Sequence, residues 1–431
     1  MSGVSLDPYL ERYAARTAGM TASEIRALFA VASRPEVVSL AGGMPFTSAL
    51  PLEAISRLVA DLVARDGATA LQYGSGQGVP ELREHICTVM ALEGISASPD
   101  DVVVTVGSQQ ALDLVTRIFI DPGDVVVAEA PSYVGALGTF ASYQADVVHV
   151  PMDEAGLVPE ALDEACSALA RAGRRVKFLY TVPNFHNPAG VSLSVPRRDV
   201  VVEIAARHNM LILEDNPYGL LGFDGDPVRA LRAQTQEGVI YLGSFSKTFA
   251  SGLRVGWVLA PHAVREKLVL AAEASVLCPP NFTQMLVADY LRTQPWQQQI
   301  KVFQEIYRER RDALLEALEQ LLPEGTRWTR PAGGFYSWVT LPDGLDSKAM
   351  LPRAVTARVA YVPGTAFYAD GSGSDFMRLS YCYPEPERIR EGVRRLAGVI
   401  EQEQEARATF GTAHHPPSAA PAAEAPGPDL A

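Results

Sequence analysis

Residues 239–260 read V-I-Y-L-G-S-F-S-K-T-F-A-S-G-L-R-V-G-W-V-L-A. It holds two short apolar runs, Val239–Gly243 and Gly256–Ala260, on either side of a polar turn. Near-continuous runs rich in Val, Ile and Leu are typical of strands that are covered on both faces, as in a mostly parallel sheet. Further runs of this kind precede it at Asp101–Val106, Asp124–Ala130, Ala145–Pro151, Val176–Val182 and Met210–Asp215.

Helical patterns lie between several of these runs, for example at Gln109–Phe119 and Arg197–His208. Strand–helix alternation predicts an α/β fold. We expect a large domain over residues 65–295, with a mostly parallel seven-stranded sheet flanked by helices. Residues 1–64, an N-terminal arm, and residues 296–400 are expected to form a small α/β domain beside it. A helix is predicted to start at the capping box Thr21-Ala-Ser-Glu24.

The end of the chain has a different composition. From about Glu401 onward it becomes rich in Pro and Ala, and it has little apolar surface to bury. We therefore predict a disordered tail over residues 401–431.

Composition excludes several classes of protein. The chain has 431 residues, of which 48% are hydrophobic and 20% charged, as is usual for globular proteins. Its net charge of −13 argues against a nucleic-acid partner, because phosphate binding needs a basic surface. No run approaches the roughly 18 apolar residues of a membrane span. Charged residues at the start of the chain, among them Asp7 and Glu11, argue against a secretory signal.

The cysteine pattern predicts a cytoplasmic protein. The four cysteines are scattered singly, without a C-x-x-C pair, so neither a disulfide framework nor a metal site is expected. Reduced thiols are usual in the cytoplasm.

Polar residues follow the ends of the predicted strands, where α/β sheets bind ligands. Ser108 and Gln109 open a helix, whose free N–H groups suit a phosphate. Ser244, Ser246 and Arg254 add hydroxyl donors and a permanent positive charge, which also suit a phosphate.

Two further residues in the same set complete a recognisable chemistry. Lys247 can condense with an aldehyde if its amine is uncharged. Asp215 can keep a pyridine nitrogen protonated. A phosphate, an aldehyde and a protonated pyridine together describe pyridoxal 5′-phosphate.

Seven stretches carry a resemblance to a known family. They are S-L-A-G-G-M-P (39–45), L-Q-Y-G-S-G-Q-G-V-P-E-L-R (71–83), G-S-Q-Q-A-L-D-L (107–114), N-P-A-G (187–190), E-D-N-P-Y (214–218), S-F-S-K-T-F-A-S-G-L-R-V-G-W (244–257) and M-R-L-S-Y (377–381). From about Arg16 to Leu396 the chain resembles the fold-type-I, pyridoxal-phosphate-dependent aminotransferases of class I and II. Within that family it is most similar to the aminoadipate, kynurenine and multisubstrate branch.

The resemblance implies roles around the cofactor. Tyr218 and the amide of Asn187 would bond its phenolic oxygen, and Tyr133 would stack on its ring. Arg254 would clamp its phosphate. Tyr73 would reach the phosphate in the other subunit, so that a homodimer shares its active sites.

The resemblance also implies a substrate site. Arg378 would bind the α-carboxylate of the substrate, in the bidentate geometry that a guanidinium offers. Gly42 and Gly43 would lie in a loop near the substrate, with Asn187 and Tyr73. The segment Ser275–Phe282 would line the same pocket.

Some of these assignments have rivals in the sequence. Glu214 is the alternative to Asp215, although it should point to the opposite face if the strand alternates to its end. Asn184 and His186 share a loop with Asn187 and are the alternatives there. The mechanism implied is ping-pong transfer of an amino group from an L-amino acid to a 2-oxo acid, with 2-oxoglutarate expected as the acceptor.

Alternative functions remain open at this point. The same scaffold supports β-elimination, decarboxylation or oxidation. An aminotransferase-like ligand sensor is a further alternative, disfavoured by the acidic chain and by the short segment before Gly42. For the donor, Gly19 stands where aminoadipate-type relatives place an arginine, with Arg16 nearby but offset. We therefore expect aromatic, branched or other neutral or basic donors rather than strictly acidic ones.

Overall fold

The computed structural model describes residues 7, 9–20 and 34–411, and its large domain is built on one sheet. The strand order is β2-β9-β8-β7-β6-β3-β4-β5. The strands span Val102–Thr105 (β2), Val125–Ala130 (β3), Asp146–Asp153 (β4), Gly156–Leu157 (β5), Val176–Thr181 (β6), Leu211–Asp215 (β7), Val239–Ser244 (β8) and Gly256–Leu259 (β9). The central strands β4, β3, β6, β7 and β8 are parallel, whereas β9 is antiparallel to both β8 and β2.

All seven predicted strands are present, and the α/β prediction is confirmed. The sheet has one strand more than predicted, because β5 adds a short antiparallel pair to the end of β4. Two residues are too few to give a periodic signal in the sequence.

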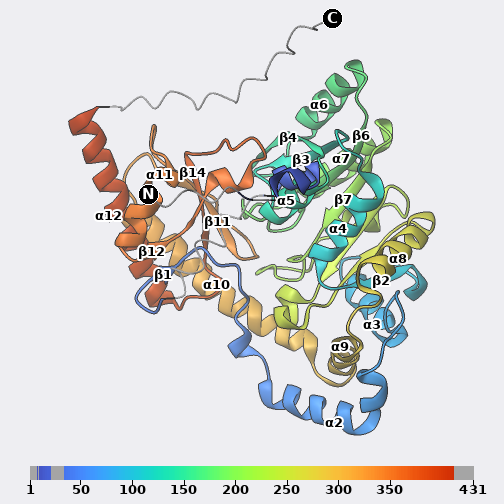
Figure 1. Cartoon of the computed structure of the whole chain (residues 1–431). Coiled ribbons are helices and arrows are strands. Elements are labelled where there is room, and N and C mark those ends of the chain that lie inside the picture. Colours follow the sequence, from blue (N-terminus) through green and yellow to red (C-terminus); the bar gives the residue numbers. More distant parts are fainter. Residues whose placement is uncertain (1–6, 8, 21–33, 412–431) are drawn as a thin grey trace, which may run out of the picture.

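Helices cover both faces of this sheet (Figure 1). Val126 and Ala128 of β3 belong to the core cluster on the face of α4 (Ser108–Phe119) and α5 (Val134–Ser142). The alternate residues of β3, Val125 and Val127, belong to a second cluster with α6 and α7. Those two helices span Pro159–Arg171 and Val195–Arg207. The two buried faces explain why the strands read as continuous apolar runs.

A helical layer adjoins the β2–β9 end of the sheet, with α8 (His262–Val276) packed on β2 and α4. Beyond it, α2 (Leu52–Ala70) and α3 (Pro80–Ala91) both pack on α9 (Asn281–Thr293). Most of α2 precedes residue 65, where we expected the large domain to begin, yet the helix packs on elements of that domain.

The small domain is shown in orange and red in Figure 1. It contains a four-stranded antiparallel sheet in the order β10-β11-β14-β13. Its elements are α10 (Trp296–Leu321), β10 (Arg327–Trp328), β11 (Tyr336–Thr340), α11 (Ser347–Thr356), β12 (Val359–Ala360), β13 (Val362–Pro363), β14 (Phe376–Ser380) and α12 (Pro386–Phe410). The N-terminal segment joins this domain because β1 (Val38–Ser39) pairs with β12.

Short helical turns complete the structure. They are η1 (Leu10–Arg12), η2 (Ala15–Gly19), η3 (Thr47–Ala49), η4 (Pro99–Asp101), η5 (Leu231–Ala233), η6 (Ser246–Ala250), η7 (Ser251–Leu253) and η8 (Gly364–Phe367).

The first part of the predicted tail, residues 401–410, is helical instead. Helix α12 continues through Glu401 to Phe410, because E-Q-E-Q-E-A-R-A is made of strong helix formers. Glu403 also forms a 2.7 Å ion pair with Arg353 of α11. The Pro/Ala-rich residues 412–431 lie outside the described residues, as does the helix start predicted at Thr21. No helix in the described part of the chain is long and apolar enough to cross a membrane.

Candidate active site

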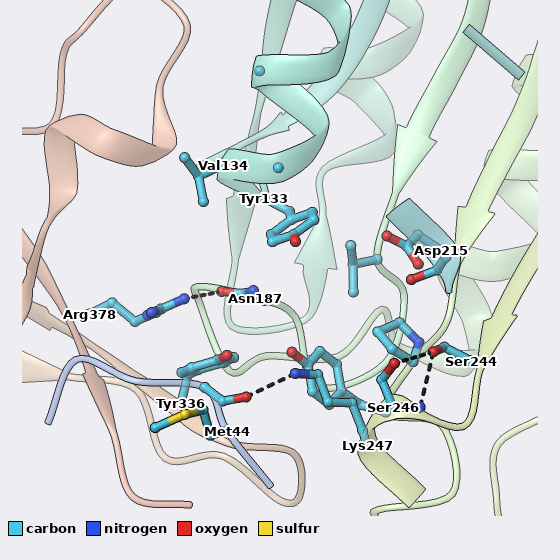
Figure 2. Close-up of a pocket in the computed structure, with 17 residues that line it drawn as sticks. Met44, Tyr133, Val134, Asn187, Asp215, Ser244, Ser246, Lys247, Tyr336 and Arg378 are labelled. Atoms are coloured by element: carbon cyan, nitrogen blue, oxygen red, sulfur yellow. Dashed lines mark hydrogen bonds between the residues drawn. The ribbon is translucent and has the colours of Figure 1, made fainter. Parts of the chain in front are cut away.

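A cavity of about 530 Å³ lies between the two domains, at the carboxyl ends of β6, β7 and β8 (Figure 2). The large domain, the small domain and the N-terminal segment all contribute to its wall. The lining residues are Gly43, Met44, Ser108, Tyr133, Val134, Gly135, Gly138, Val182, Asn187, Asp215, Pro217, Tyr218, Ser244, Ser246, Lys247, Tyr336 and Arg378. The cavity therefore collects most of the site residues predicted from the sequence.

Lys247 projects into the cavity from η6, directly after β8. Its amine donates a 2.8 Å hydrogen bond to the carbonyl oxygen of Gly43. Burial lowers the pKa of Lys247 to about 8, and the positive charges of Arg378 and Arg254 act in the same direction. The uncharged amine is therefore more populated near neutral pH than it is for an ordinary lysine. An uncharged amine can act as a nucleophile and as a base.

Asp215 lies at the end of β7 and is 3% exposed. Its Oδ2 accepts a 2.8 Å hydrogen bond from the hydroxyl of Tyr180. Its Oδ1 is buried and has no partner among the described residues. Burial raises the pKa of Asp215 to about 6. Because buried polar atoms are nearly always paired, the free oxygen indicates that a ligand supplies a donor here.

Glu214 points away from the cavity, as strand alternation predicts. Its carboxylate accepts hydrogen bonds from the backbone N–H groups of Leu231 and Arg232, at 2.9 and 2.8 Å. The choice of Asp215 over Glu214 as the residue facing the cavity therefore agrees with the structure.

Neither rival in the loop after β6 lines the cavity. The side-chain oxygen of Asn184 accepts a 2.6 Å bond from the buried Arg198. The ring of His186 lies 3.0 Å from the carboxylate of Glu129, and both side chains are almost fully buried. Asn184 and His186 thus hold the loop that carries Asn187.

One end of the cavity is rich in donors that suit a phosphate. The hydroxyl oxygens of Ser244 and Ser246 lie 2.8 Å apart, and Arg254 donates to Ser246 at 3.3 Å. Gly107 precedes α4 with a φ of 75°, and a side chain at this position would collide with the guanidinium of Arg254. The start of α4, at Ser108, and Arg254 therefore meet at one place.

The side chain of Gln109 does not lie at the predicted phosphate site. Its side chain donates a 2.9 Å bond to Thr139 of α5, and it does not line the cavity. Only its backbone N–H, in the first turn of α4, stays in keeping with a phosphate site.

Arg378 occupies the opposite side of the cavity and is 3% exposed. It donates to the side-chain oxygen of Asn187 at 2.8 Å and to the carbonyl oxygen of Ala41 at 2.7 Å. Its guanidinium carbon lies 4.2 Å from the centre of the Tyr336 ring. Its Nε is buried without a partner in the described part of the chain. Arg378 is therefore a fixed cation that suits a carboxylate ligand.

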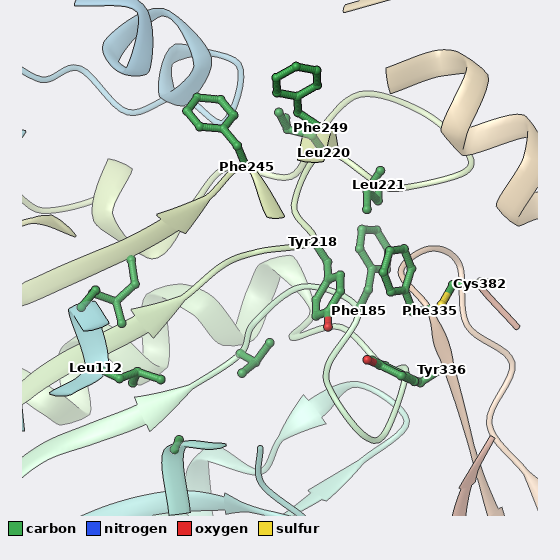
Figure 3. Packing of buried hydrophobic residues seen from close by; sticks show 14 of the residues in the cluster. Leu112, Phe185, Tyr218, Leu220, Leu221, Phe245, Phe249, Phe335, Tyr336 and Cys382 are labelled. Atoms are coloured by element: carbon green, nitrogen blue, oxygen red, sulfur yellow. The ribbon is translucent and has the colours of Figure 1, made fainter. Parts of the chain in front are cut away.

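Aromatic rings frame the centre of the cavity. Tyr133 lies at the start of α5, where a Cβ on Gly135 would come within 2.5 Å of its ring. Burial raises the pKa of Tyr133 to about 12, so its hydroxyl keeps its proton. Tyr218 packs edge-on against Phe335 and Tyr336, with ring centres 5.3 and 6.1 Å away (Figure 3).

Sequence reasoning missed some lining residues and placed one segment, 275–282, in a cavity that it does not line. Tyr336 was missed, although its position after Gly333-Gly334 and at the start of β11 was a usable signal. Tyr73 is 76% exposed and lies outside the cavity. The segment 275–282 does not line the cavity either, and its Asn281 bonds to the carbonyl oxygen of Thr69 instead.

The residues present fit pyridoxal phosphate. The unpaired oxygen of Asp215 suits a protonated ring nitrogen, and the amine of Lys247 suits an aldehyde. The hydroxyls and guanidinium beside the start of α4 suit a phosphate. All of these groups face one cavity, or its rim in the case of Arg254.

Comparisons with known proteins agree with this geometry. The sequence profile of the family described as "Aminotransferase class I and II" matches residues 35–396. The chain is 43% identical over 398 residues to aromatic-amino-acid aminotransferase 1 from Thermococcus litoralis, covering 92% of this chain and 95% of that protein.

Two solved structures have the same fold at clear sequence identity. The Pyrococcus horikoshii kynurenine aminotransferase superposes with a TM-score of 0.88 at 40% identity, covering 92% of this chain and 98% of the other. The Thermus thermophilus alpha-aminoadipate aminotransferase superposes with a TM-score of 0.86 at 35% identity, covering 93% of this chain and all of the other. The first of these structures is a complex with PMP, and the second is a complex with N-(5'-phosphopyridoxyl)-L-leucine. From the profile match, the identities and the shared fold, the chain belongs to the class I and II aminotransferases, fold-type-I enzymes that depend on pyridoxal phosphate.

Proposed function

We propose that Lys247, Asp215 and Arg378 carry the amino-group transfer in this chain, by a ping-pong mechanism. The observation that carries the proposal is that these three side chains face one cavity, with a depressed lysine pKa and an unpaired aspartate oxygen. When bound, pyridoxal phosphate supplies the aldehyde that takes up the amino group and the ring that draws electrons from the donor's Cα.

The chain's own residues would then orient both molecules. Arg378 binds the donor's carboxylate through the donor atoms that Asn187 and Ala41 leave free. Asp215, as an anion, pairs with the protonated ring nitrogen. Tyr218 and Asn187, which both line the cavity, would bond the phenolic oxygen.

Further residues hold the phosphate and the ring. The phosphate would be held by Ser108, Ser244, Ser246, Arg254 and the backbone of Gln109. Tyr133, which lines the cavity, would contact the ring.

Lys247 moves the proton. Its uncharged Nζ takes the proton from the donor's Cα, and the carbonyl of Gly43 orients the amine. The low pKa of Lys247 favours this role, because the amine needs little free energy to lose its own proton.

We further propose an aromatic or other apolar donor, with a 2-oxo acid as acceptor. Met44, Val134 and Val182 give the cavity apolar wall, and Gly138 leaves open space beside it. Among the described lining residues, the cations are Lys247 and Arg378, so none is left over for a second carboxylate on the donor. The Thermococcus relative is named for aromatic amino acids, which agrees with this choice.

A homodimer completes the proposed site. Tyr73 lies between α2 and α3 and is highly exposed, with the exposed side chains of Leu71 and Leu52 on neighbouring segments. Such a surface suits a second copy of the chain, whose phosphate site Tyr73 would reach. We also propose a cytoplasmic location, because all four cysteines are free thiols.

A half-reaction screen tests the proposed function. Purified protein loaded with pyridoxal phosphate is mixed with single amino acids, and the 2-oxo acid released is identified by mass spectrometry. Release of one 2-oxo acid per site, with the aromatic donors fastest, is expected. Faster reaction with aspartate, glutamate or aminoadipate would contradict the proposed donor class. Release of ammonia or CO₂ in place of a 2-oxo acid would contradict the assignment of transfer to these residues.

A further inference from the structure

Tyr180 of β6 does not line the cavity, but it contacts Asp215, which does. Its hydroxyl donates a 2.8 Å hydrogen bond to Oδ2 of Asp215, and both side chains are buried. Strand register explains the contact, because Tyr180 lies opposite Leu213 on β7 and Thr181 lies opposite Glu214. Tyr180 and Asp215 therefore share one face of the sheet, on a diagonal that a long side chain can span.

The ring of Tyr180 is held in a rigid aromatic cluster. It packs edge-on against Phe140, with ring centres 5.5 Å apart, and Phe140 packs against Phe178 at 5.7 Å. All three rings are fully buried. Phe140 belongs to α5, the helix that starts directly after Tyr133. The hydroxyl of Tyr180 thus has a fixed position from which to orient Asp215.

This arrangement divides the two oxygens of Asp215 between two tasks. Oδ2 is occupied by Tyr180, whereas Oδ1 is buried and has no partner among the residues that the structure describes. A carboxylate without the first bond could rotate and would exchange the two oxygens. We propose that Tyr180 is a positioning residue, which holds Asp215 as an oriented anion with Oδ1 directed at the cofactor's ring nitrogen. This inference rests on the proposed function of Asp215.

The hydrogen bond from Tyr180 is one of several influences on the pKa of Asp215. Burial raises the pKa of Asp215, while the hydrogen bond from Tyr180 and the nearby charges of Lys247 and His186 lower it. Tyr133 also lies close enough for the carboxylate to raise its pKa. Removing the Tyr180 hydroxyl takes away the largest of the influences that favour the anion. Asp215 would then be neutral in more molecules, and a neutral acid pairs poorly with a protonated nitrogen.

The test measures the protonation of the cofactor's ring nitrogen in Tyr180→Phe. The enzyme is loaded with pyridoxal phosphate that carries ¹⁵N in the ring, and the nitrogen is observed by NMR. At a fixed pH we expect the ratio of protonated to unprotonated nitrogen to fall about tenfold, as for the loss of one hydrogen bond to a charged group. Cofactor affinity should fall by a similar factor, about tenfold. The matched control is Tyr361→Phe, which removes a buried hydroxyl that bonds to Ser347 in the small domain.

The outcomes separate this inference from the function on which it rests. If the ring nitrogen has the same ratio of protonated to unprotonated form in Tyr180→Phe as in the wild type, Tyr180 does not position Asp215, even if activity falls. If Asp215→Asn also leaves the nitrogen unchanged, Asp215 is not its partner, and the assignment of Asp215 under the proposed function fails as well. Should Tyr180→Phe not fold, Phe140→Leu keeps the hydroxyl and loosens the ring, and a smaller change in the same direction is expected. No change in Phe140→Leu would count against the inference.

Discussion

The amine of Lys247 donates a 2.8 Å hydrogen bond to the carbonyl oxygen of Gly43, a residue 204 positions earlier in the chain. The N-terminal segment reaches the cavity because β1 pairs with β12 of the small domain. A larger residue at position 43 would require Tyr336 to move, since a side chain there would collide with the hydroxyl of Tyr336. The reactive lysine of the large domain is thus oriented by a loop that belongs to the other domain.

The first prediction concerns Lys247→Ala. Loss of the amine removes the group that takes the Cα proton, so the half-reaction should slow by at least about 10²–10⁴-fold, the usual contribution of a general base. Cofactor should still bind through Asp215 and the phosphate donors, as equilibrium dialysis would show. Lys301→Ala, on the exposed side of α10, is the control. Turnover of Lys247→Ala at the wild-type rate would remove Lys247 from the mechanism.

The second prediction follows from the pKa of Lys247, which burial lowers from its ordinary value to about 8. The amine is charged below this pH and uncharged above it, and only the uncharged form attacks an aldehyde. The rate of cofactor uptake by cofactor-free protein should therefore rise with pH and reach half its maximum near pH 8, measured by stopped-flow absorbance.

A variant tests the cause of that pH dependence. The positive charge of Arg378 helps to lower the pKa of Lys247, so Arg378→Met should move the half-maximum to higher pH. Arg388→Met, at a guanidinium that bonds the carbonyl oxygens of Pro35 and Val37, should leave it in place. A profile that is flat between pH 6 and 9 would show that Lys247 does not limit uptake.

The sequence predicted the parts of the site that depend on local pattern. Asp215 and Lys247 each follow a strand of continuous apolar residues, so their meeting at one sheet edge follows from parallel pairing. Strand alternation likewise separates Glu214 from Asp215.

Other parts depend on packing across the chain, which a single sequence does not encode locally. Tyr336 enters the cavity because the small domain folds back over the large one, and Tyr180 reaches Asp215 only through the register of β6 and β7. The exposed position of Tyr73 depends on how α2 and α3 pack on α9.

The third prediction concerns Arg378→Lys. The lysine keeps the charge but loses the planar pair of donors, and it cannot reach Asn187 and Ala41 together with a carboxylate. The kcat/KM for the preferred donor should fall by at least about 30-fold, equivalent to about 2 kcal/mol. The same loss for donor and acceptor is expected, because both carry an α-carboxylate. A loss confined to one of them would contradict a shared carboxylate site.

The fourth prediction uses mixed dimers to test Tyr73. Tyr73→Phe should lower cofactor affinity by about tenfold, as for one hydrogen bond to a charged phosphate. In a mixed dimer of Tyr73→Phe and Lys247→Ala subunits, the Tyr73→Phe subunit keeps Lys247 and receives an intact Tyr73 from its partner. That site should regain wild-type affinity and rate when the differently tagged mixed dimer is purified. If Tyr73 acts within its own subunit, or if the chain does not dimerise, no recovery will be seen.

The fifth prediction addresses the donor's side chain at Gly138. This residue lines the cavity on α5, and open space lies where its side chain would begin. Gly138→Leu should fill that space and lower kcat/KM for aromatic donors by at least about 10–200-fold, the range for a change of one methylene in an apolar pocket. A small donor such as alanine should react at close to the wild-type rate, because it does not extend that far. Gly398→Leu is the control, since Gly398 is also helical and also faces open space, but lies in α12. An equal loss for alanine and for aromatic donors in Gly138→Leu would show that the variant disturbs Tyr133 and the cofactor site, and would remove Gly138 from the donor pocket.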